Sequence, residues 1–353
     1  MSRFLSEEYA SLEEYVPGEQ PRDRRYIKLN TNESPYPPSP AVLSTVCAEA
    51  AEKLCLYSDP DSKDLKDAIA SLSGVGRANV FVSNGSDDIL NFAFMAFGKK
   101  TGVIFPDITY GFYSVFAALH GLDAKIMPLK EDFTVKVEDY LNAGRMVVLA
   151  NPNAPTGIAL PLSEIERVVA SNPSQVVLVD EAYVDFGGES ALPLTKKYDN
   201  LLVVQTFSKS RSMAGARLGY AFASEAIIKD LEKIKFSTNP YNVNRVTQAA
   251  GVAALGEQAY YDENCRRIVE TRTRTREALM ALGFEVTDST ANFLFARHES
   301  VSGEEIYLRL KEKGVLVRHF DTPRIVDYNR ITVGTPEEMD AMLSALREIL
   351  KGN

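Results

Sequence analysis

The chain has 353 residues, of which 45% are hydrophobic and 25% are charged, and its formal net charge is −9. This length suffices for about two domains, the composition is that of a folded globular protein, and the negative charge argues against general binding to nucleic acid or to an anionic membrane. The three cysteines and three histidines predict neither a disulfide framework nor a metal site, and the charged N-terminus without a long apolar run indicates a cytoplasmic protein with no membrane span.

The predicted elements divide the chain into three parts. Residues 1–40 are rich in proline and are expected to form an N-terminal arm with little regular structure. Residues 41–255 alternate short apolar runs with amphipathic helical stretches and are expected to form a large domain. Residues 256–353 begin with a long charged helix and are expected to form a smaller α+β domain.

Most expected strands of the large domain are unbroken runs of Val, Ile and Leu. Such runs are typical of strands that helices cover on both faces, as in mainly parallel sheets, so the sequence predicts an α/β fold. The expected strands cover residues 79–82, 102–105, 125–129, 146–150, 176–179 and 201–206. Helices are expected between them, for example over 87–97 and 163–171. The C-terminal part predicts helices over 260–282 and 336–350 and strands over 293–296, 315–318 and 330–333.

Polar residues follow the ends of several predicted strands, which is where an open α/β sheet binds its ligands. After the first strand, residues 83–87 read Ser-Asn-Gly-Ser-Asp and lead into a helix. Backbone N–H groups at such a helix start suit a phosphate, and an ordinary helix cap is the alternative interpretation. After the fourth strand, residues 151–157 read Asn-Pro-Asn-Ala-Pro-Thr-Gly, which predicts a rigid turn.

Two further strands end in groups that carry chemistry. The fifth is followed directly by Asp180, with Tyr183 close behind. The sixth ends at Thr206 and leads to Ser208 and Lys209. Taken alone, the acid is an ordinary residue at a sheet edge and the lysine an ordinary surface charge.

Together these strand ends offer the groups that pyridoxal 5′-phosphate needs. Gly85, Ser86, Ser208 and Arg217 form a candidate phosphate cup, and Tyr110 offers an aromatic ring. A lysine can form a Schiff base with the aldehyde of this cofactor, and a carboxylate can keep its pyridine nitrogen protonated. The sequence therefore predicts a pyridoxal phosphate enzyme.

The spacing of Asp180, Lys209 and Arg217 resembles that of the fold-type I aminotransferases of the aspartate aminotransferase superfamily. More narrowly, the whole chain resembles the histidinol-phosphate aminotransferase family. The segments that carry this resemblance are residues 29–36, 84–87, 180–183, 206–209, 240–244 and 330–334.

The resemblance implies a large domain with a mainly parallel seven-stranded sheet and a smaller C-terminal α+β domain. It also implies an activity, which is the ping-pong transfer of an amino group from L-histidinol phosphate to 2-oxoglutarate. The products would be imidazole acetol phosphate and L-glutamate, as in histidine biosynthesis.

Roles for individual residues follow from the same resemblance. Lys209 would form the Schiff base and move the proton at the substrate carbon. Asp180 would pair with the pyridine nitrogen, Tyr183 would bind the phenolic oxygen O3′, and Tyr110 would stack on the ring. The phosphate region would be covered by Gly85, Ser86, Asp87, Thr206, Ser208 and Arg217.

Tyr57 resembles the tyrosine with which a neighbouring subunit reaches the cofactor phosphate. This implies a homodimer with shared active sites. A tyrosine that only packs in a core or an interface is the alternative.

One position departs from the family. The residue directly before Pro155, Thr156 and Gly157 is usually an asparagine that binds O3′, and here it is Ala154. Asn153 either reaches the cofactor from a shifted loop or is only a turn residue, in which case Tyr183 holds O3′ without it.

Substrate binding is expected in the small domain. Arg330 resembles the arginine that binds the phosphate of histidinol phosphate in one half-reaction and the carboxylate of glutamate in the other. Arg318, Tyr15 and Asn32 are expected beside it and favour a phosphorylated substrate. Arg318 and Tyr15 as plain surface residues are the alternative.

Three other functions are consistent with parts of the pattern. An aromatic amino acid aminotransferase would share this scaffold, and a pyridoxal-phosphate-dependent phospho-amino-acid decarboxylase would release CO₂ and need no oxo-acid acceptor. A ligand-sensing domain without activity is disfavoured, because Lys209 is present and no helix-turn-helix pattern or basic stripe is visible.

Overall fold

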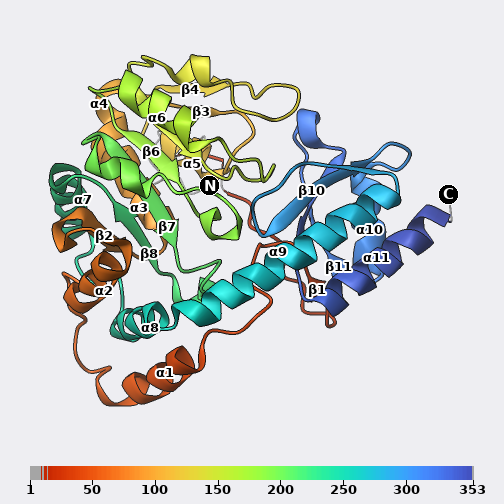
Figure 1. Cartoon of the computed structure of the whole chain (residues 1–353), viewed down its shortest axis with the longest axis horizontal. Helices are drawn as coiled ribbons and strands as arrows, with labels where there is room; N and C mark the ends of the chain where they lie inside the picture. Colours follow the sequence, from red (N-terminus) through yellow and green to blue (C-terminus); the bar gives the residue numbers. More distant parts are fainter. Residues whose placement is uncertain (1–8, 10–11, 14, 352–353) are drawn as a thin grey trace.

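The computed structural model describes residues 9, 12–13 and 15–351. Part of the predicted arm (1–8, 10–11 and 14) and the last two residues of the predicted small domain lie outside the described residues. Figure 1 shows two bodies of mixed helix and strand, with the long helix α9 (Gln258–Ala281) running along both. No helix in the described part of the chain is both long enough and apolar enough to cross a membrane.

The larger body is built on a seven-stranded sheet in the order β2-β8-β7-β6-β5-β3-β4. Neighbouring strands are parallel except where β8 pairs with β2 and with β7. The strands are β2 (Val80–Ser83), β3 (Val103–Pro106), β4 (Ala124–Met127), β5 (Met146–Ala150), β6 (Val177–Asp180), β7 (Leu201–Thr206) and β8 (Gly219–Phe222). The sequence predicts all of these except β8, which is short and begins with a glycine, a residue that strands disfavour.

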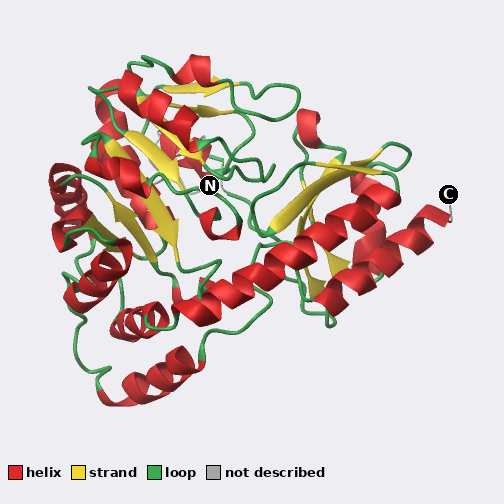
Figure 2. Cartoon of the chain, in the orientation of Figure 1, coloured by secondary structure: helices red, strands yellow, loops and turns green. Residues whose placement is uncertain are grey.

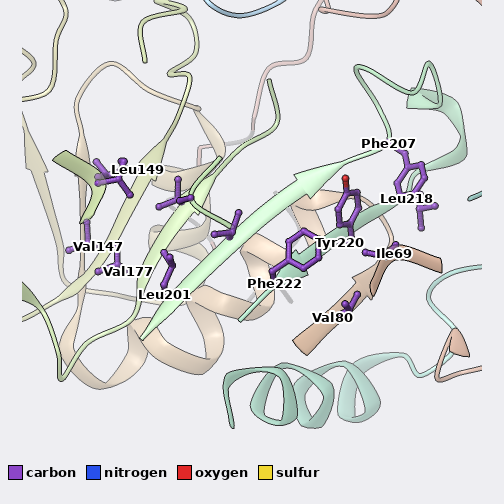
Figure 3. Packing of buried hydrophobic residues seen from close by; sticks show 14 of the residues in the cluster. Ile69, Val80, Val147, Leu149, Val177, Leu201, Phe207, Leu218, Tyr220 and Phe222 are labelled. Carbon is purple, nitrogen blue, oxygen red and sulfur yellow. The ribbon is translucent and has the colours of Figure 1, made fainter. Parts of the chain in front are cut away.

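This sheet is buried on both faces, which explains its continuous apolar strands. Side chains alternate between the faces of a strand, so Val147 and Leu149 join one hydrophobic cluster and Val148 joins the other. Figure 3 shows the first cluster, in which side chains of β5 to β8 gather with Ile69 of α2. Full burial of one such side chain contributes about 2 kcal/mol, so the two clusters supply much of the stability of the sheet.

Helices cover both faces of the large sheet. The cluster of Figure 3 includes residues of α2 (Lys63–Ser73), α6 (Leu162–Ser171) and α8 (Arg245–Leu255). The opposite cluster includes residues of α3 (Ser86–Ala93), α5 (Phe112–Leu119) and α7 (Glu225–Thr238). Further helical segments are α1 (Pro40–Glu52), which packs on α8, the π-helical turn Phe94–Gly98, and α4 (Lys99–Thr101). Short 3₁₀ turns lie at Arg77–Asn79, Val137–Tyr140, Val184–Phe186, Leu192–Lys196, Ala214–Ala216 and Pro323–Ile325.

The smaller body holds a four-stranded antiparallel sheet in the order β12-β13-β10-β9. A separate parallel pair joins β1 of the arm to β11, with Ile27 opposite Val315. These strands are β1 (Ile27–Lys28), β9 (Phe284–Val286), β10 (Phe293–His298), β11 (Val315–Leu316), β12 (Arg318–His319) and β13 (Tyr328–Thr332). Residues of α9, α10 (Gly303–Glu312) and α11 (Pro336–Lys351) pack on one face of the sheet, and Figure 2 shows these helices next to its strands.

The predicted boundary after residue 255 falls between α8 and α9. The division into arm, large domain and small domain stays a prediction. One predicted strand, over 315–318, is split into β11 and β12, which belong to different sheets.

Aromatic side chains join the two bodies. Phe133, which follows β4, meets Phe295 of β10 and Tyr328 of β13 edge-on, with ring centres 5.9 and 5.3 Å away. Because Phe133 lies beyond the carboxyl end of its strand, the small sheet faces the carboxyl edge of the large one. The ligand-binding edge expected from the sequence is therefore covered by the small body.

Candidate active site

Lys209 lies three residues after the end of β7 and points toward the arm. Its Nζ donates to the backbone carbonyl of Thr31 at 3.4 Å and lies 5.6 Å from the centre of the Tyr183 ring. Lys209 forms no salt bridge with any residue that the structure describes. Within the described part of the chain, the predicted nucleophile therefore has no carboxylate partner, and it lies beside the predicted phenol.

Asp180 ends β6 and is 5% exposed. Its Oδ2 accepts a hydrogen bond from the Tyr113 hydroxyl at 2.8 Å, and its Oδ1 accepts one from the backbone N–H of Ala182 at 3.2 Å. Burial raises the pKa of Asp180 to about 6, and the two hydrogen bonds oppose that rise. A buried carboxylate of this kind suits a ligand that brings a positive charge to it.

The turn between β2 and α3 leaves the start of α3 open. Gly85 occupies the N-cap position with a φ of +84°, and no side chain caps the helix. A Cβ at Gly85 would lie 2.7 Å from the guanidinium of Arg217, and one at Gly219 of β8 would lie 2.4 Å from the backbone nitrogen of Ser86. Both positions therefore require glycine, and the helix N-terminus between them is available to an anion.

Ser208 and Thr206 lie at the neighbouring strand end. The Thr206 hydroxyl donates to the Ser208 hydroxyl at 3.0 Å and accepts from the Ser208 backbone N–H at 3.1 Å. Asp87 links two other predicted cofactor residues, because it accepts from Arg217 at 2.9 Å and from the Tyr110 hydroxyl at 2.8 Å. The candidate phosphate cup and the candidate stacking ring thus share one carboxylate.

Asn153 is held inside its own turn. Its Nδ2 donates to the Ile108 carbonyl at 2.9 Å and to the Thr156 hydroxyl at 3.1 Å, and its Oδ1 accepts from the Thr109 hydroxyl at 2.8 Å. The next residue, Ala154, is buried among apolar side chains of the small body. These contacts favour the interpretation of Asn153 as a turn residue, and its contact with a cofactor stays a prediction.

Tyr183 receives a hydrogen bond from the arm. Its hydroxyl accepts from Asn32 Nδ2 at 3.0 Å, and its ring lies edge-on to Phe293 with the centres 5.1 Å apart. Asn32 is 1% exposed, and its Oδ1 accepts from the Thr332 hydroxyl at 3.0 Å. Asn32 therefore lies beside Tyr183, and its predicted contact with a substrate stays a prediction.

Arg330 and Arg318 lie directly opposite each other on β13 and β12. The Arg330 guanidinium donates to the Asn30 carbonyl at 3.1 Å, and its Nε is buried with no hydrogen-bond partner among the described residues. Arg318 donates to the carbonyls of Val16 and Pro17 at 2.9 and 3.1 Å. Neither arginine forms a salt bridge within the described ranges of the chain.

Tyr15 completes this end of the site. Its ring stacks on Phe112 with the centres 4.2 Å apart and lies edge-on to Tyr110 at 6.2 Å. Burial raises the pKa of the Tyr15 hydroxyl, and the nearby charges of Arg330 and Arg318 oppose the rise. The structure therefore brings Tyr15 and both arginines close to three of the predicted cofactor residues, Tyr110, Tyr183 and Asp87.

Tyr57 lies in the loop between α1 and α2 and is 78% exposed. Its ring stacks on Tyr241 at 4.6 Å, and its backbone carbonyl accepts from Arg245 at 2.6 Å. The residue after Tyr241, Asn242, donates to the Ser83 hydroxyl, at the turn that precedes α3. Tyr57 is thus a predicted cofactor residue on an exposed loop, and its ring stacks on none of the other predicted cofactor residues that the structure describes.

Two residues of the site are missed by the sequence analysis. Tyr113 lies inside the apolar helix α5, where nothing distinguishes it from a core aromatic. Gly219 matters because Ser83 pairs with it across β2 and β8, and that pairing needs the strand that the sequence does not predict. The glycine directly after Arg217 and Leu218 is the signal that could have indicated a close approach.

An α/β sheet with a lysine, a buried acid and an open helix N-terminus at its carboxyl edge defines a ligand-binding enzyme site of the kind found in aminotransferases. Comparison with known proteins gives the family: the profile described as aminotransferase class I and II matches residues 24–346. The chain belongs to the class I and II aminotransferases and is an aminotransferase enzyme.

Similar proteins agree over the full length. The histidinol-phosphate aminotransferase of Brachyspira hyodysenteriae is 48% identical over 353 residues, covering 99% of this chain and 100% of that protein. The protein of the same name from Marinomonas sp. is 50% identical over 353 residues, with the same coverage. The crystal structure of histidinol-phosphate aminotransferase from Sinorhizobium meliloti in complex with pyridoxal-5′-phosphate has a TM-score of 0.86 and 26% identity, covering 93% of this chain and 92% of that one. The predicted fold, enzyme class and cofactor are confirmed at this level.

The residues of the site fit pyridoxal 5′-phosphate. The open start of α3 at Gly85 suits its phosphate, and buried Asp180, which has no cationic partner in hydrogen-bond contact among the described residues, suits its ring nitrogen. Lys209 supplies an amine, and Tyr183, whose ring centre lies 5.6 Å from that amine, supplies a hydroxyl. Their roles toward the cofactor stay predictions.

Proposed function

We propose that this aminotransferase moves an amino group between L-histidinol phosphate and 2-oxoglutarate by a ping-pong mechanism, with imidazole acetol phosphate and L-glutamate as products. The names of the full-length relatives support this substrate, and so does the chemistry of the small body. The reaction belongs to histidine biosynthesis. The single observation that carries the proposal is the pair Arg318 and Arg330.

Two like charges directly opposite each other on neighbouring strands are unfavourable unless an anion lies between them. Burial and the nearby charge of Arg318 lower the pKa of Arg330, so a bound anion would stabilise the charge of this guanidinium. A phosphate group offers oxygens to two guanidinium groups at once, whereas a carboxylate fills a single two-pronged contact. The pair therefore favours a phosphorylated amino substrate, and the α-carboxylate of glutamate would take the place of the phosphate in the other half-reaction.

The catalytic groups would act around the bound cofactor. Pyridoxal 5′-phosphate, when bound, supplies the electron-accepting ring that the reaction at the substrate carbon needs. Asp180 would keep the ring nitrogen protonated, and Tyr183 would donate its hydroxyl toward O3′. Lys209 would take the proton from the substrate carbon on its Nζ and deliver it to the cofactor side.

We further propose a homodimer in which Tyr57 reaches the site of the neighbouring chain. Exposed apolar side chains lie in the loop of Tyr57, on α1 before it and at Tyr241, which stacks on Tyr57. A second copy would cover these side chains, which are Leu43, Leu54, Leu56, Tyr57 and Tyr241 with exposures of 52, 67, 58, 78 and 42%. A cytoplasmic location is proposed because the substrates are charged metabolites that do not enter a membrane unaided.

Arginine variants test the substrate assignment. The Arg318→Ala variant should raise the KM for L-histidinol phosphate by roughly 10- to 100-fold and leave the KM for L-phenylalanine unchanged, because it removes charge-assisted bonds to phosphate alone. Arg330→Ala should impair both L-histidinol phosphate and glutamate. Arg297→Ala is the matched control, since Arg297 lies on β10 of the same sheet and pairs with Glu285 at the surface. Equal effects of Arg318→Ala on both amino donors would favour an aromatic amino acid aminotransferase instead.

A further inference from the structure

Tyr113 contacts two groups of the proposed cofactor site although it does not reach the surface. It lies on α5 and is 0% exposed. Its hydroxyl donates to Asp180 Oδ2 at 2.8 Å, and its ring meets the ring of Tyr110 edge-on, with the centres 5.7 Å apart at 86°. The remaining aromatic contacts of Tyr113 are with Phe94 and Phe105. One buried side chain therefore contacts both the proposed partner of the ring nitrogen and the proposed stacking ring.

The hydrogen bond between Tyr113 and Asp180 has a fixed direction. Burial and the charge of Asp180 raise the pKa of the Tyr113 hydroxyl well above its ordinary value, so the proton stays on the phenol. A phenol that keeps its proton donates to the charged form of the carboxylate and favours that form. The backbone N–H of Ala182 supports the other oxygen of the same group. Together these donors fix the orientation of the carboxylate.

Few other groups favour the charged form of Asp180. Among the described residues, the largest effects of charged groups on Asp180 come from Asp87, which opposes its ionisation, and from Lys209, which favours it. No guanidinium or ammonium group lies within salt-bridge distance of Asp180 in that part of the chain. The Tyr113 hydroxyl is therefore the side-chain hydrogen-bond donor that holds this carboxylate.

We propose that Tyr113 is a positioning residue of the enzyme: it holds the Asp180 carboxylate in the charged form and orientation that pair with the cofactor ring nitrogen, and it braces Tyr110 against the cofactor ring. This inference rests on the proposed function, which assigns Asp180 to the ring nitrogen. It goes beyond that function because Tyr113 itself touches neither cofactor nor substrate. This role distinguishes Tyr113 from the phenylalanines of α5, which have no hydroxyl and contribute only packing.

The test compares two cofactors on two proteins. Dissociation constants of pyridoxal 5′-phosphate and of its 1-deaza analogue, in which C–H replaces the ring nitrogen, are measured by fluorescence titration for the wild-type protein and for Tyr113→Phe. The substitution keeps the ring and removes one hydroxyl. Affinity for pyridoxal 5′-phosphate should fall by roughly tenfold or more, and affinity for the analogue should change by less than about twofold, because only the natural cofactor uses the charge of Asp180.

A matched control shows that removing a buried phenol is not itself the cause. Tyr140 is 1% exposed and lies outside the site, so Tyr140→Phe should change neither constant. Equal weakening of both cofactors by Tyr113→Phe would overturn the proposal, because a packing defect does not distinguish a ring nitrogen from a carbon. No weakening of either would overturn it as well.

Failure of the proposed function gives a different result. If the wild-type protein binds the natural cofactor no better than the deaza analogue, Asp180 does not pair with the ring nitrogen, and the assignment of that residue fails before Tyr113 is considered. If Tyr113→Phe does not fold, as judged by far-UV circular dichroism, 3-fluorotyrosine at residue 113 replaces it. Fluorine strengthens the phenol as a donor, so the preference for the natural cofactor should increase, and an unchanged preference would contradict the proposal.

Discussion

The side-chain amide of Asn32 donates a hydrogen bond to the hydroxyl of Tyr183 at 3.0 Å. Asn32 belongs to the arm, and Tyr183 follows β6. The side-chain oxygen of Asn32 accepts a hydrogen bond from Thr332, which ends β13. A single buried side chain thus connects the arm, the large sheet and the small sheet. Ala154 has no side-chain amide, so the Tyr183 hydroxyl is the group that we propose for O3′ of the cofactor. The hydrogen bond from Asn32 fixes the position of this hydroxyl.

Replacing Asn32 with glycine tests this dependence. Asn32 has a φ of 55°, which glycine adopts without strain, so Asn32→Gly removes the side chain and keeps the backbone. Affinity for pyridoxal 5′-phosphate should fall by roughly tenfold, because the Tyr183 and Thr332 hydroxyls lose a buried partner. Asn142→Gly is the control, since Asn142 is exposed and has a similar φ of 48°. An Asn32→Gly protein with the affinity of the control would contradict the expected role.

Asn153 is expected to act on stability rather than on the cofactor. Asn153→Ala removes three hydrogen bonds from the turn, two of them buried, and should lower the free energy of unfolding by about 3 kcal/mol. The visible absorption of the cofactor-loaded protein should not shift. Asn172→Ala, which removes buried hydrogen bonds to Tyr140 and Val168, is the comparison for the urea titration. A shifted spectrum without loss of stability would show instead that Asn153 reaches the cofactor.

Asp180 should make the stability of the cofactor-free protein depend on pH. Burial raises its pKa to about 6, above the ordinary value of 3.8, so the folded state binds this proton more tightly than the unfolded state. The free energy of unfolding therefore falls as the pH rises from about 4 to 6, by up to about 3 kcal/mol. The Asp180→Asn side chain does not ionise, so its burial carries no cost of charging. This variant should therefore be more stable than wild type above pH 6 but not below pH 4.

Thermal unfolding of both cofactor-free proteins across this pH range is the measurement. Glu181, whose pKa burial raises to about 7, is present in both proteins, so its contribution cancels in the comparison. Saturating pyridoxal 5′-phosphate should stabilise the wild type more than the variant. A stability difference between the two proteins that stays constant with pH would show that burial does not raise the pKa of Asp180.

The proposed sharing of active sites can be tested by mixing two damaged chains. A dimer of Lys209→Ala with Tyr57→Ala contains one site that has both residues if Tyr57 acts on the neighbouring chain. Random mixing should then restore about one quarter of the wild-type activity, since half of the dimers are mixed and each has one intact site. If Tyr57 acts within its own chain, no mixed site is intact and no activity returns.

The chemistry-bearing strand ends are predictable from the sequence, whereas the contacts that orient them are not. Lys209 and Asp180 follow apolar runs, and the carboxyl ends of parallel strands meet at one edge, so order along the chain is enough to bring them together. The bond from Tyr113 to Asp180 spans 67 residues and that from Asn32 to Tyr183 spans 151. Neither segment has a pattern that indicates its partner.

Strand β8 is likewise a part of the fold that the sequence does not predict. Its antiparallel pairing places Gly219 against the turn at Gly85 and so shapes the candidate phosphate cup. A strand of this length is held by its two neighbours in the sheet rather than by its own propensity. The cup is therefore visible in the sequence only as its separate glycines.

The most direct test of the proposed function is the visible spectrum of the wild-type, cofactor-loaded protein during addition of an amino donor without an acceptor. L-Histidinol phosphate should bleach the yellow absorption at concentrations far below those needed with L-phenylalanine, and 2-oxoglutarate should restore it. Equal bleaching by both donors would contradict the phosphate preference assigned to Arg318 and Arg330. The absence of a yellow band would contradict the assignment of Lys209 and with it the mechanism.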